Sequence, residues 1–234
     1  MAVVFLITLV VRLPARALVA LLPPDVTCAA PSGTIWSGSC GQLRAAPIVV
    51  SALSWQLHPA ALLRARIGAD VASQDPAANG HATLELRTNG DLSLTALVAN
   101  LALPRDSGLV PAGASGTLQL AIDSARIEGG HVVAVQGTVD LQQLHIESPA
   151  ADLGSFELQF ASPNQGATMV GLLRDLDGPL SMIGTLHLKR DGSYELQGSV
   201  APRAGSGADL TQLLQLLGPP DAQGRRALSI AGTL

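Results

Sequence analysis

Residues 116–146, "GTLQLAIDSARIEGGHVVAVQGTVDLQQLHI", decide the fold class of this chain. Apolar and polar side chains alternate along the stretch, and Gly129 and Gly130 divide it into two runs. Alternation with a period of two is typical of a β-strand with one face in contact with apolar groups, and a glycine pair between two such runs is typical of a hairpin turn. The stretch therefore predicts two antiparallel strands joined at Gly129 and Gly130.

The same pattern recurs on both sides of this hairpin. It is present at residues 80–98 around "NG", at residues 184–200 around "DG", and in the closing run "LSIAGTL" at residues 228–234. Strands that follow one another through tight turns form a meander. We therefore expect a mainly β protein built on a curved antiparallel sheet.

Alternation also predicts one apolar face and one polar face for this sheet. The apolar side expected from the pattern holds Leu84, Leu86, Leu118, Leu120, Ile122, Leu186, Leu188, Leu196 and Val200. The polar side holds Glu85, Arg87, Gln119, Lys189, Glu195 and Gln197. Short helices are expected at residues 59–67, 169–176 and 208–217, and they cover only part of such a sheet. Either the sheet folds over on itself, or its apolar face forms a groove that receives another molecule.

The first eleven residues, "MAVVFLITLVV", are uncharged and apolar, and Arg12 ends this run. Extending the segment to residue 22 gives the length of about 20 residues that a membrane span needs, but it places Arg12 near the bilayer centre. We interpret residues 1–24 as a membrane anchor truncated at its start, followed by an extracytoplasmic β domain at residues 25–234. Two alternatives stay open: a signal peptide cleaved after "ARA" at residues 15–17, and a buried helix.

Cys28 and Cys40 are the only cysteines, and Pro31, Gly33 and Gly38 between them allow the chain to turn back. We predict a disulfide bond, which an oxidising periplasm permits and which contributes about 3 kcal/mol for a loop of this size. The alternative is a pair of buried free thiols. A metal site is not expected, because no CxxC motif or neighbouring histidine pair completes a tetrahedral ligand set.

Composition argues against several classes of function. Charged residues make up 14% of the chain and the formal net charge is −4, so we expect no basic patch and no nucleic-acid partner. A mean hydropathy of +0.35 indicates membrane contact. The sequence contains no nucleophile elbow, phosphate-binding loop or HExxH motif, and its histidines are isolated. We therefore expect no catalytic residues, no cofactor and no enzymatic activity.

Two stretches carry a more specific signature. The first, at residues 32–67, combines a G-T-hydrophobic-W-x-G turn with a later W-x-L-x-P segment and a pair of leucines. Its signature residues are Gly33, Thr34, Ile35, Trp36, Gly38, Trp55, Leu57, Pro59, Leu62 and Leu63. The second, at residues 210–234, combines a Leu-rich helix with a D-x-x-G turn and a closing strand. Its signature residues are Leu217, Gly218, Asp221, Gly224, Gly232 and Leu234.

In this order, the two stretches resemble the type II secretion system protein N family, and the resemblance covers nearly the whole chain. It implies a single-pass protein of the bacterial inner membrane, with its C-terminal domain in the periplasm. Its implied partners are the inner-membrane platform proteins C, L and M and the outer-membrane secretin. The basic residues that usually precede the family's membrane segment are missing here, and the cysteine pair is not part of the family pattern.

The repeated "GTLxL" strands also look like those of AsmA-like and TamB-like envelope proteins, whose curved sheets form apolar grooves for lipid. This likeness, together with the incompletely covered apolar face, supports an alternative function as a periplasmic lipid-binding or lipid-handling protein. For Trp36 and Trp55 we expect a structural role at the membrane-proximal end of the sheet. A partner-binding patch and direct contact with the bilayer surface are the alternatives.

Overall fold

The computed structural model describes residues 12–19, 26–45, 48–103, 113–147, 150–161 and 168–233. Over these ranges the protein is mainly β, with thirteen strands and three short helices, as the alternating pattern predicts. The chain divides into two compact units, Met1–Ala99 and Asn100–Leu234. The border between the two units falls within strand β6.

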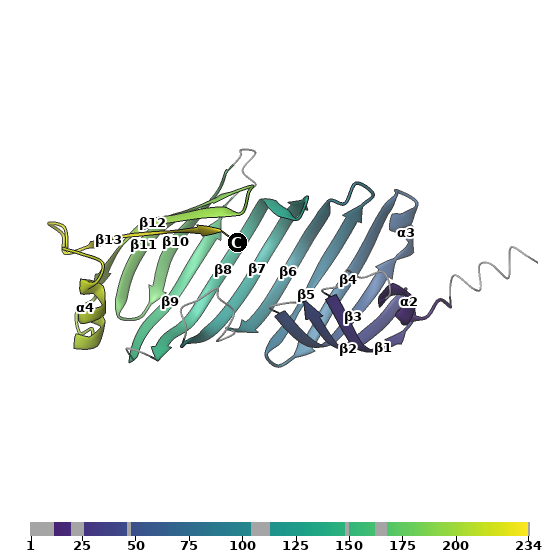
Figure 1. Cartoon of the computed structure of the whole chain (residues 1–234), viewed down its shortest axis with the longest axis horizontal. Coiled ribbons are helices and arrows are strands. Elements are labelled where there is room, and N and C mark those ends of the chain that lie inside the picture. The colour runs from purple at the N-terminus through teal and green to yellow at the C-terminus, as the bar shows by residue number, and fades with distance from the viewer. Residues whose placement is uncertain are drawn as a thin grey trace, which may run out of the picture. The chain divides into compact units, whose positions relative to one another are not determined.

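Unit 1 is a meander in which the strand order follows the chain from β1 to β6 (Figure 1). Its strands are β1 (Val26–Gly33), β2 (Ser37–Ala45), β3 (Ile48–His58), β4 (Arg66–Asp75), β5 (Ala78–Arg87) and β6 (Leu92–Ala102). Its helices are α2 (Ala15–Val19) and α3 (Pro59–Leu62). The predicted turn at "NG" lies between β5 and β6, where Gly90 has a φ of +88°.

A disulfide bond joins Cys28 of β1 to Cys40 of β2, with 5.8 Å between the two Cα atoms. The antiparallel register places Cys28 opposite Leu43 and Cys40 opposite Pro31, so the bond links the two strands diagonally. Cys40 is only 1% exposed. The bond therefore ties the first strand of unit 1 to the second at a buried position.

Unit 2 is also a meander, with the order β7 to β13 (Figure 1, teal to yellow). Its strands are β7 (Ala114–Glu128), β8 (His131–Glu147), β9 (Ala150–Phe160), β10 (Thr168–Asp177), β11 (Leu180–Lys189), β12 (Ser193–Pro202) and β13 (Arg226–Thr233). Helix α4 (Ala208–Gln215) connects β12 to β13. The hairpin predicted from residues 116–146 is confirmed, because β7 and β8 pair antiparallel and Glu128 lies opposite His131.

Helix α4 packs onto the sheet of unit 2, and the helix and sheet together form the core of this unit. Leu210 and Leu214 of the helix are buried against Phe156 of β9, Leu180 of β11 and Val200 of β12. The two leucines are four residues apart and so lie on one face of the helix, while Asp209 and Thr211 are exposed. The apolar stripe of α4 therefore covers part of the apolar face of the sheet.

The three helix predictions have different outcomes. The helix expected at residues 208–217 is confirmed as α4, and the one expected at residues 59–67 is limited to α3. The prediction for residues 169–176 is wrong, because they belong to strand β10. In that strand Leu173 faces the apolar side of the sheet, while Leu172 is 54% exposed. Apolar residues on both faces of a strand imitate the spacing of a helix.

Most of the predicted membrane anchor, residues 1–11 and 20–24, lies outside the described residues. Between these stretches, α2 is five residues long. None of the helices in the described ranges is both long enough and apolar enough to cross a bilayer. The anchor thus stays a prediction.

Removal of the disulfide should destabilise unit 1. We expect Cys28→Ala combined with Cys40→Ala to lower the free energy of unfolding by about 3 kcal/mol, because the unfolded chain regains the freedom of the open loop. Urea denaturation followed by tryptophan fluorescence would measure this, since both tryptophans lie in unit 1. A reductant should destabilise the parent protein and leave the double variant unchanged. Alkylation of both thiols in the unreduced parent would contradict the expectation.

Candidate functional site

The structure brings the two tryptophans of the first signature together. Trp36 lies in the turn between β1 and β2, and Trp55 lies in β3. The indole N–H of Trp55 donates a hydrogen bond to the carbonyl of Ile35 at 3.1 Å. The amide of Leu57 donates to the carbonyl of Trp36 at 2.7 Å. The end of β3 is thus bonded to the turn through both the backbone and the Trp55 ring.

Two glycines of the signature make this close approach possible. Gly38 lies opposite Trp55 in the β2–β3 register, and a Cβ atom at Gly38 would lie 2.5 Å from Cζ2 of the Trp55 ring. Gly33 has a φ of +83°, and a Cβ atom there would lie 2.5 Å from the carbonyl oxygen of Ser37. Both positions therefore require glycine, one for the ring and one for the turn.

The same turn holds the segment that precedes α2. The amide of Ile35 donates to the carbonyl of Leu13 at 3.0 Å, and Pro14 forms a β-bridge with Thr34. Ala15, the first residue of α2, is buried. The Trp36 turn therefore contacts both β3 and the described part of the predicted anchor. That the rings close a membrane-proximal end of the sheet stays a prediction.

The rest of the first signature forms α3 and an exposed surface. Pro59 begins the helix. Proline is suited to this position because an N–H group there would have no partner within the helix. The helix lies over Gly68 of β4, because the position of a Cβ atom on Gly68 is 3.3 Å from the Cβ of Ala61. Leu62 is 48% exposed and Leu63 is 90% exposed. The leucine pair therefore points away from the core of unit 1.

The second signature forms local structure in unit 2. Oδ1 of Asp221 accepts hydrogen bonds from the amides of Gln223 and Arg225 at 2.9 and 2.8 Å, and Gly224 takes a φ of +77° in this turn. A guanidinium N–H of Arg226 donates to the carbonyl of Gly218, just after α4. Gly232 lies against the ring of Tyr194, which a side chain would displace. Gly218, Asp221 and Gly224 thus shape the connection from α4 to β13, whereas Gly232 lies near the end of β13.

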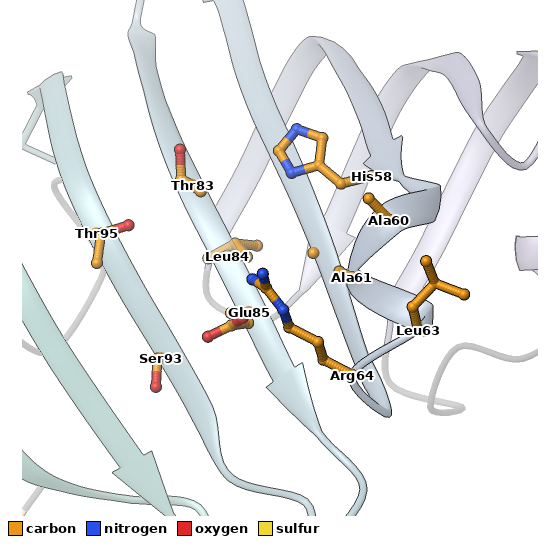
Figure 2. Close-up of a pocket in the computed structure, with 11 residues that line it drawn as sticks. His58, Ala60, Ala61, Leu63, Arg64, Thr83, Leu84, Glu85, Ser93 and Thr95 are labelled. Atoms are coloured by element: carbon orange, nitrogen blue, oxygen red, sulfur yellow. The ribbon is translucent and has the colours of Figure 1, made fainter.

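A pocket of about 640 Å³ lies in unit 1 between α3 and strands β4 to β6 (Figure 2). Its lining mixes apolar side chains with polar and charged ones, and for the latter we call it the polar pocket. Figure 2 shows the Arg64 side chain extending from the end of α3 towards β5, with Ser93 and Thr95 on the neighbouring strand. Glu85 is held by Arg66, whose Nη1 lies 3.2 and 3.1 Å from the two carboxylate oxygens. Arg64 has no ion pair within the part of the chain that the structure describes. Among the described residues that line it, the pocket therefore offers Arg64 as a cation without an ion pair, together with the hydroxyl groups of Ser93 and Thr95.

Beside this pocket, Asp70 joins His58 to Thr83. Nε2 of His58 lies 2.8 Å from Oδ2 of Asp70, and the Thr83 hydroxyl donates to Oδ1 of Asp70 at 2.7 Å. These bonds, that from Thr83 first and that from His58 second, lower the pKa of Asp70 below its usual value. A nucleophile–histidine–carboxylate triad requires the histidine to face the hydroxyl. Here the carboxylate lies between them, so this arrangement cannot activate Thr83 in that way.

The described residues contain no group of three or more His, Cys, Asp or Glu side chains that could hold a metal ion. His58 pairs with one carboxylate, that of Asp70, and His145 pairs with that of Asp152 at 2.7 Å. The chemistry that the polar pocket can perform is hydrogen bonding and charge pairing with a polar partner.

A second hollow lies in unit 2 and differs completely in chemistry. It has a volume of about 690 Å³, and every side chain that lines it is Leu, Val, Ile, Met or Phe. Leu118, Leu196 and Val200, which the alternation assigns to the apolar face, are among them. An apolar groove is thus present within unit 2. That it receives another molecule, one of the two outcomes left open by the sequence, stays a prediction.

Sequence reasoning missed the polar pocket and its free cation. Arg64 appears in the sequence as part of a longer amphipathic helix, whereas α3 ends at Leu62 and the following turn directs Arg64 towards β5. Ser93 and Thr95 appear only as the polar half of an alternating strand. The glycine at position 68, inside an otherwise regular strand, is the one signal that another element approaches closely.

The Asp70 bonds should make stability depend on pH. A carboxylate with a lowered pKa in the folded state stabilises the protein above its unfolded pKa of about 3.9, and this contribution is lost as the pH falls through the folded value. We expect Asp70→Asn to lower the melting temperature at pH 7 and to have a smaller effect at about pH 3. Asp123→Asn, at an exposed carboxylate of β7, is the control. An equal loss for Asp70→Asn at both pH values would refute this assignment.

Gly38→Ala should disturb the tryptophan site. The new methyl group would overlap the Trp55 ring, and overpacking of this kind destabilises by about 1–3 kcal/mol. Gly41→Ala in the same strand is the matched control, because its Cβ would have no neighbour nearer than 3.4 Å. Intrinsic fluorescence reports on this site directly, since Trp36 and Trp55 are the only tryptophans. Unchanged emission and stability in Gly38→Ala would contradict the packing described above.

Comparison with known proteins places these features in a family. A family model described as "Type II secretion system (T2SS), protein N" matches residues 24–229. This range includes the whole first signature. It also includes the second signature except its last two residues, Gly232 and Leu234. No solved structure is significantly similar to the chain.

Curated relatives agree along almost the whole length. The type II secretion system protein N of Vibrio cholerae is 28% identical over 246 aligned residues, which cover 99% of this chain and 95% of the relative. The protein of the same name from Klebsiella pneumoniae is 29% identical, with 96% and 90% covered. That from Aeromonas hydrophila is 28% identical, with 99% and 95% covered. The chain therefore belongs to the type II secretion system protein N family.

Proposed function

We propose that this chain is a non-enzymatic inner-membrane component of a bacterial type II secretion system, and that it supports the export of folded proteins across the outer membrane. The observation that carries the proposal is the family match over residues 24–229, with relatives that carry the same name across nearly their full length. Family membership implies interaction with other components of the secretion system.

Two features support a periplasmic location for the β units, anchored by residues 1–24. The disulfide between Cys28 and Cys40 is of a kind that persists in oxidising compartments. The uncharged run that precedes Arg12 is apolar enough to enter a bilayer. Arg12 itself lies directly before the segment that bonds to the Trp36 turn. In this proposal the turn therefore lies close to the membrane surface.

The surface that we assign to protein partners is formed by α3 and the polar pocket. Leu63 is 90% exposed, Leu62 lies beside it, and the free cation of Arg64 follows directly. Arginine is enriched in protein interfaces, and the buried core of an interface is more apolar than its rim. We propose that platform protein C, L or M binds here, with the outer-membrane secretin as a further partner of the assembled system.

Secretion in a strain that lacks the gene tests this function. Complementation with the parent chain should restore exoprotein release into the medium, whereas Leu63→Asp should reduce it several-fold because it places a carboxylate in the contact surface. Leu172→Asp is the matched control, since Leu172 is also exposed but lies in unit 2. A photo-cross-linking residue at position 63 should capture a platform protein in membranes. Normal release without the gene, and no captured platform protein, would refute the proposal.

A further inference from the structure

The apolar groove of unit 2 is open and extends across the whole set of its strands. Each strand from β7 to β13 contributes at least one lining side chain, and residues 213–217 form one wall. Leu210 and Leu214 of α4 turn inward and are buried, whereas Leu216 is 85% exposed although it lines the groove. Ile230 of β13 also lines the groove and is 45% exposed. The described residues thus leave this apolar surface accessible.

The lining restricts the chemistry of an occupant. None of the lining residues carries a polar side chain, so the groove offers no side-chain hydrogen bond to a ligand. An extended peptide would bring N–H and C=O groups that need partners. A helix satisfies its own backbone, but one turn with a diameter of about 10 Å and a pitch of about 5.4 Å occupies about 420 Å³. A helix would therefore fill the groove volume of about 690 Å³ within two turns, and most of a longer helix would lie outside it.

A hydrocarbon chain has no polar groups that need partners, and it is thinner than a helix. It needs no hydrogen bond, and the groove volume of about 690 Å³ is in the range of small-molecule sites. Side chains from all seven strands line the groove, so a hydrocarbon chain bound there would meet apolar contacts from each strand.

Charge at one end of the groove indicates the head group. Arg226 lies at alternate positions with Leu228 and Ile230 on β13, so the three side chains share the face that lines the groove. The guanidinium of Arg226 donates to the carbonyl of Gly218 and has no carboxylate partner within the described ranges. Arg203, the neighbouring cation after β12, is already paired with Asp175. Arg225 donates to Ser199 and Ser181. It directly precedes Arg226, so its side chain faces the other side of the sheet. Within the described residues, Arg226 is therefore the cation on the groove side that can meet an anion at this end.

We propose that the groove of unit 2 binds an acyl chain of an anionic phospholipid, with the phosphate of the head group against Arg226. An arginine offers several N–H donors in one plane, and the bond to Gly218 uses one of them. The exposed leucines at the end of α4 and Ile230 of β13 then lie along the two sides of the hydrocarbon chain. This binding goes beyond the role in secretion and does not depend on it.

Photo-cross-linking with lipid vesicles tests the site. The full chain would be incubated with phosphatidylglycerol vesicles whose lipid carries a diazirine in one acyl chain, and the labelled peptides would be mapped by mass spectrometry. Ile230→Glu should lower labelling of the groove at least about tenfold, because a charge against hydrocarbon is strongly unfavourable. Ile183→Glu is the matched control, since Ile183 is 56% exposed in the neighbouring strands but does not line the groove.

The head-group assignment has its own test. Arg226→Gln should lower labelling by the phosphatidylglycerol probe and leave labelling by the corresponding diacylglycerol unchanged. Far-UV circular dichroism of each variant checks that the fold is retained. Labelling outside the groove, an equal loss for Ile230→Glu and Ile183→Glu, or a bound peptide in place of lipid would overturn the proposal. An equal loss of both lipids for Arg226→Gln would overturn the role of the phosphate.

Discussion

The apolar face of the unit 2 sheet is larger than the one helix that packs on it, and this mismatch governs the structure of the unit. Each strand from β7 to β13 contributes at least one side chain to the same apolar side. Helix α4 inserts only Leu210 and Leu214 into the core. A sheet of this kind exposes hydrocarbon to water unless something else covers it. The open groove is thus a direct consequence of strand pattern and helix length.

The two units reach stability by different means. In unit 2, aromatic and aliphatic side chains form a core cluster centred on Phe156, Leu180 and Val200. Unit 1 has few fully buried apolar residues in its described part, chiefly Ala15, Cys40 and Ala82. It relies instead on the disulfide and on the hydrogen bond from the Trp55 ring to Ile35. Covalent crosslinks are the usual means of stabilising a domain whose core is small.

Particular residues show how far sequence reasoning reaches. The β7–β8 hairpin is predictable because its alternation and its glycine pair are both local signals. Strand β10 is not, since Leu172 and Leu173 are adjacent and only the sheet decides which of them faces inward. The close approach of Gly171 to Phe160 is equally hard to predict from the sequence. A Cβ atom on Gly171 would lie 2.9 Å from the Phe160 ring on the neighbouring strand. Contacts of this kind depend on register, which local sequence does not contain.

The roles proposed for Arg64 and Arg226 also could not be predicted from the sequence. Each is an ordinary charged residue in the sequence, and each gains meaning only from the element beside it: α3 for Arg64 and the end of α4 for Arg226. The first cation lies among hydroxyl groups and next to exposed leucines, which suits the mixed chemistry of a protein surface. The second lies at the end of a groove without polar side chains, which suits an amphiphile. Because the two surfaces differ in polarity and belong to different units, a partner protein and a lipid would not compete for the same side chains.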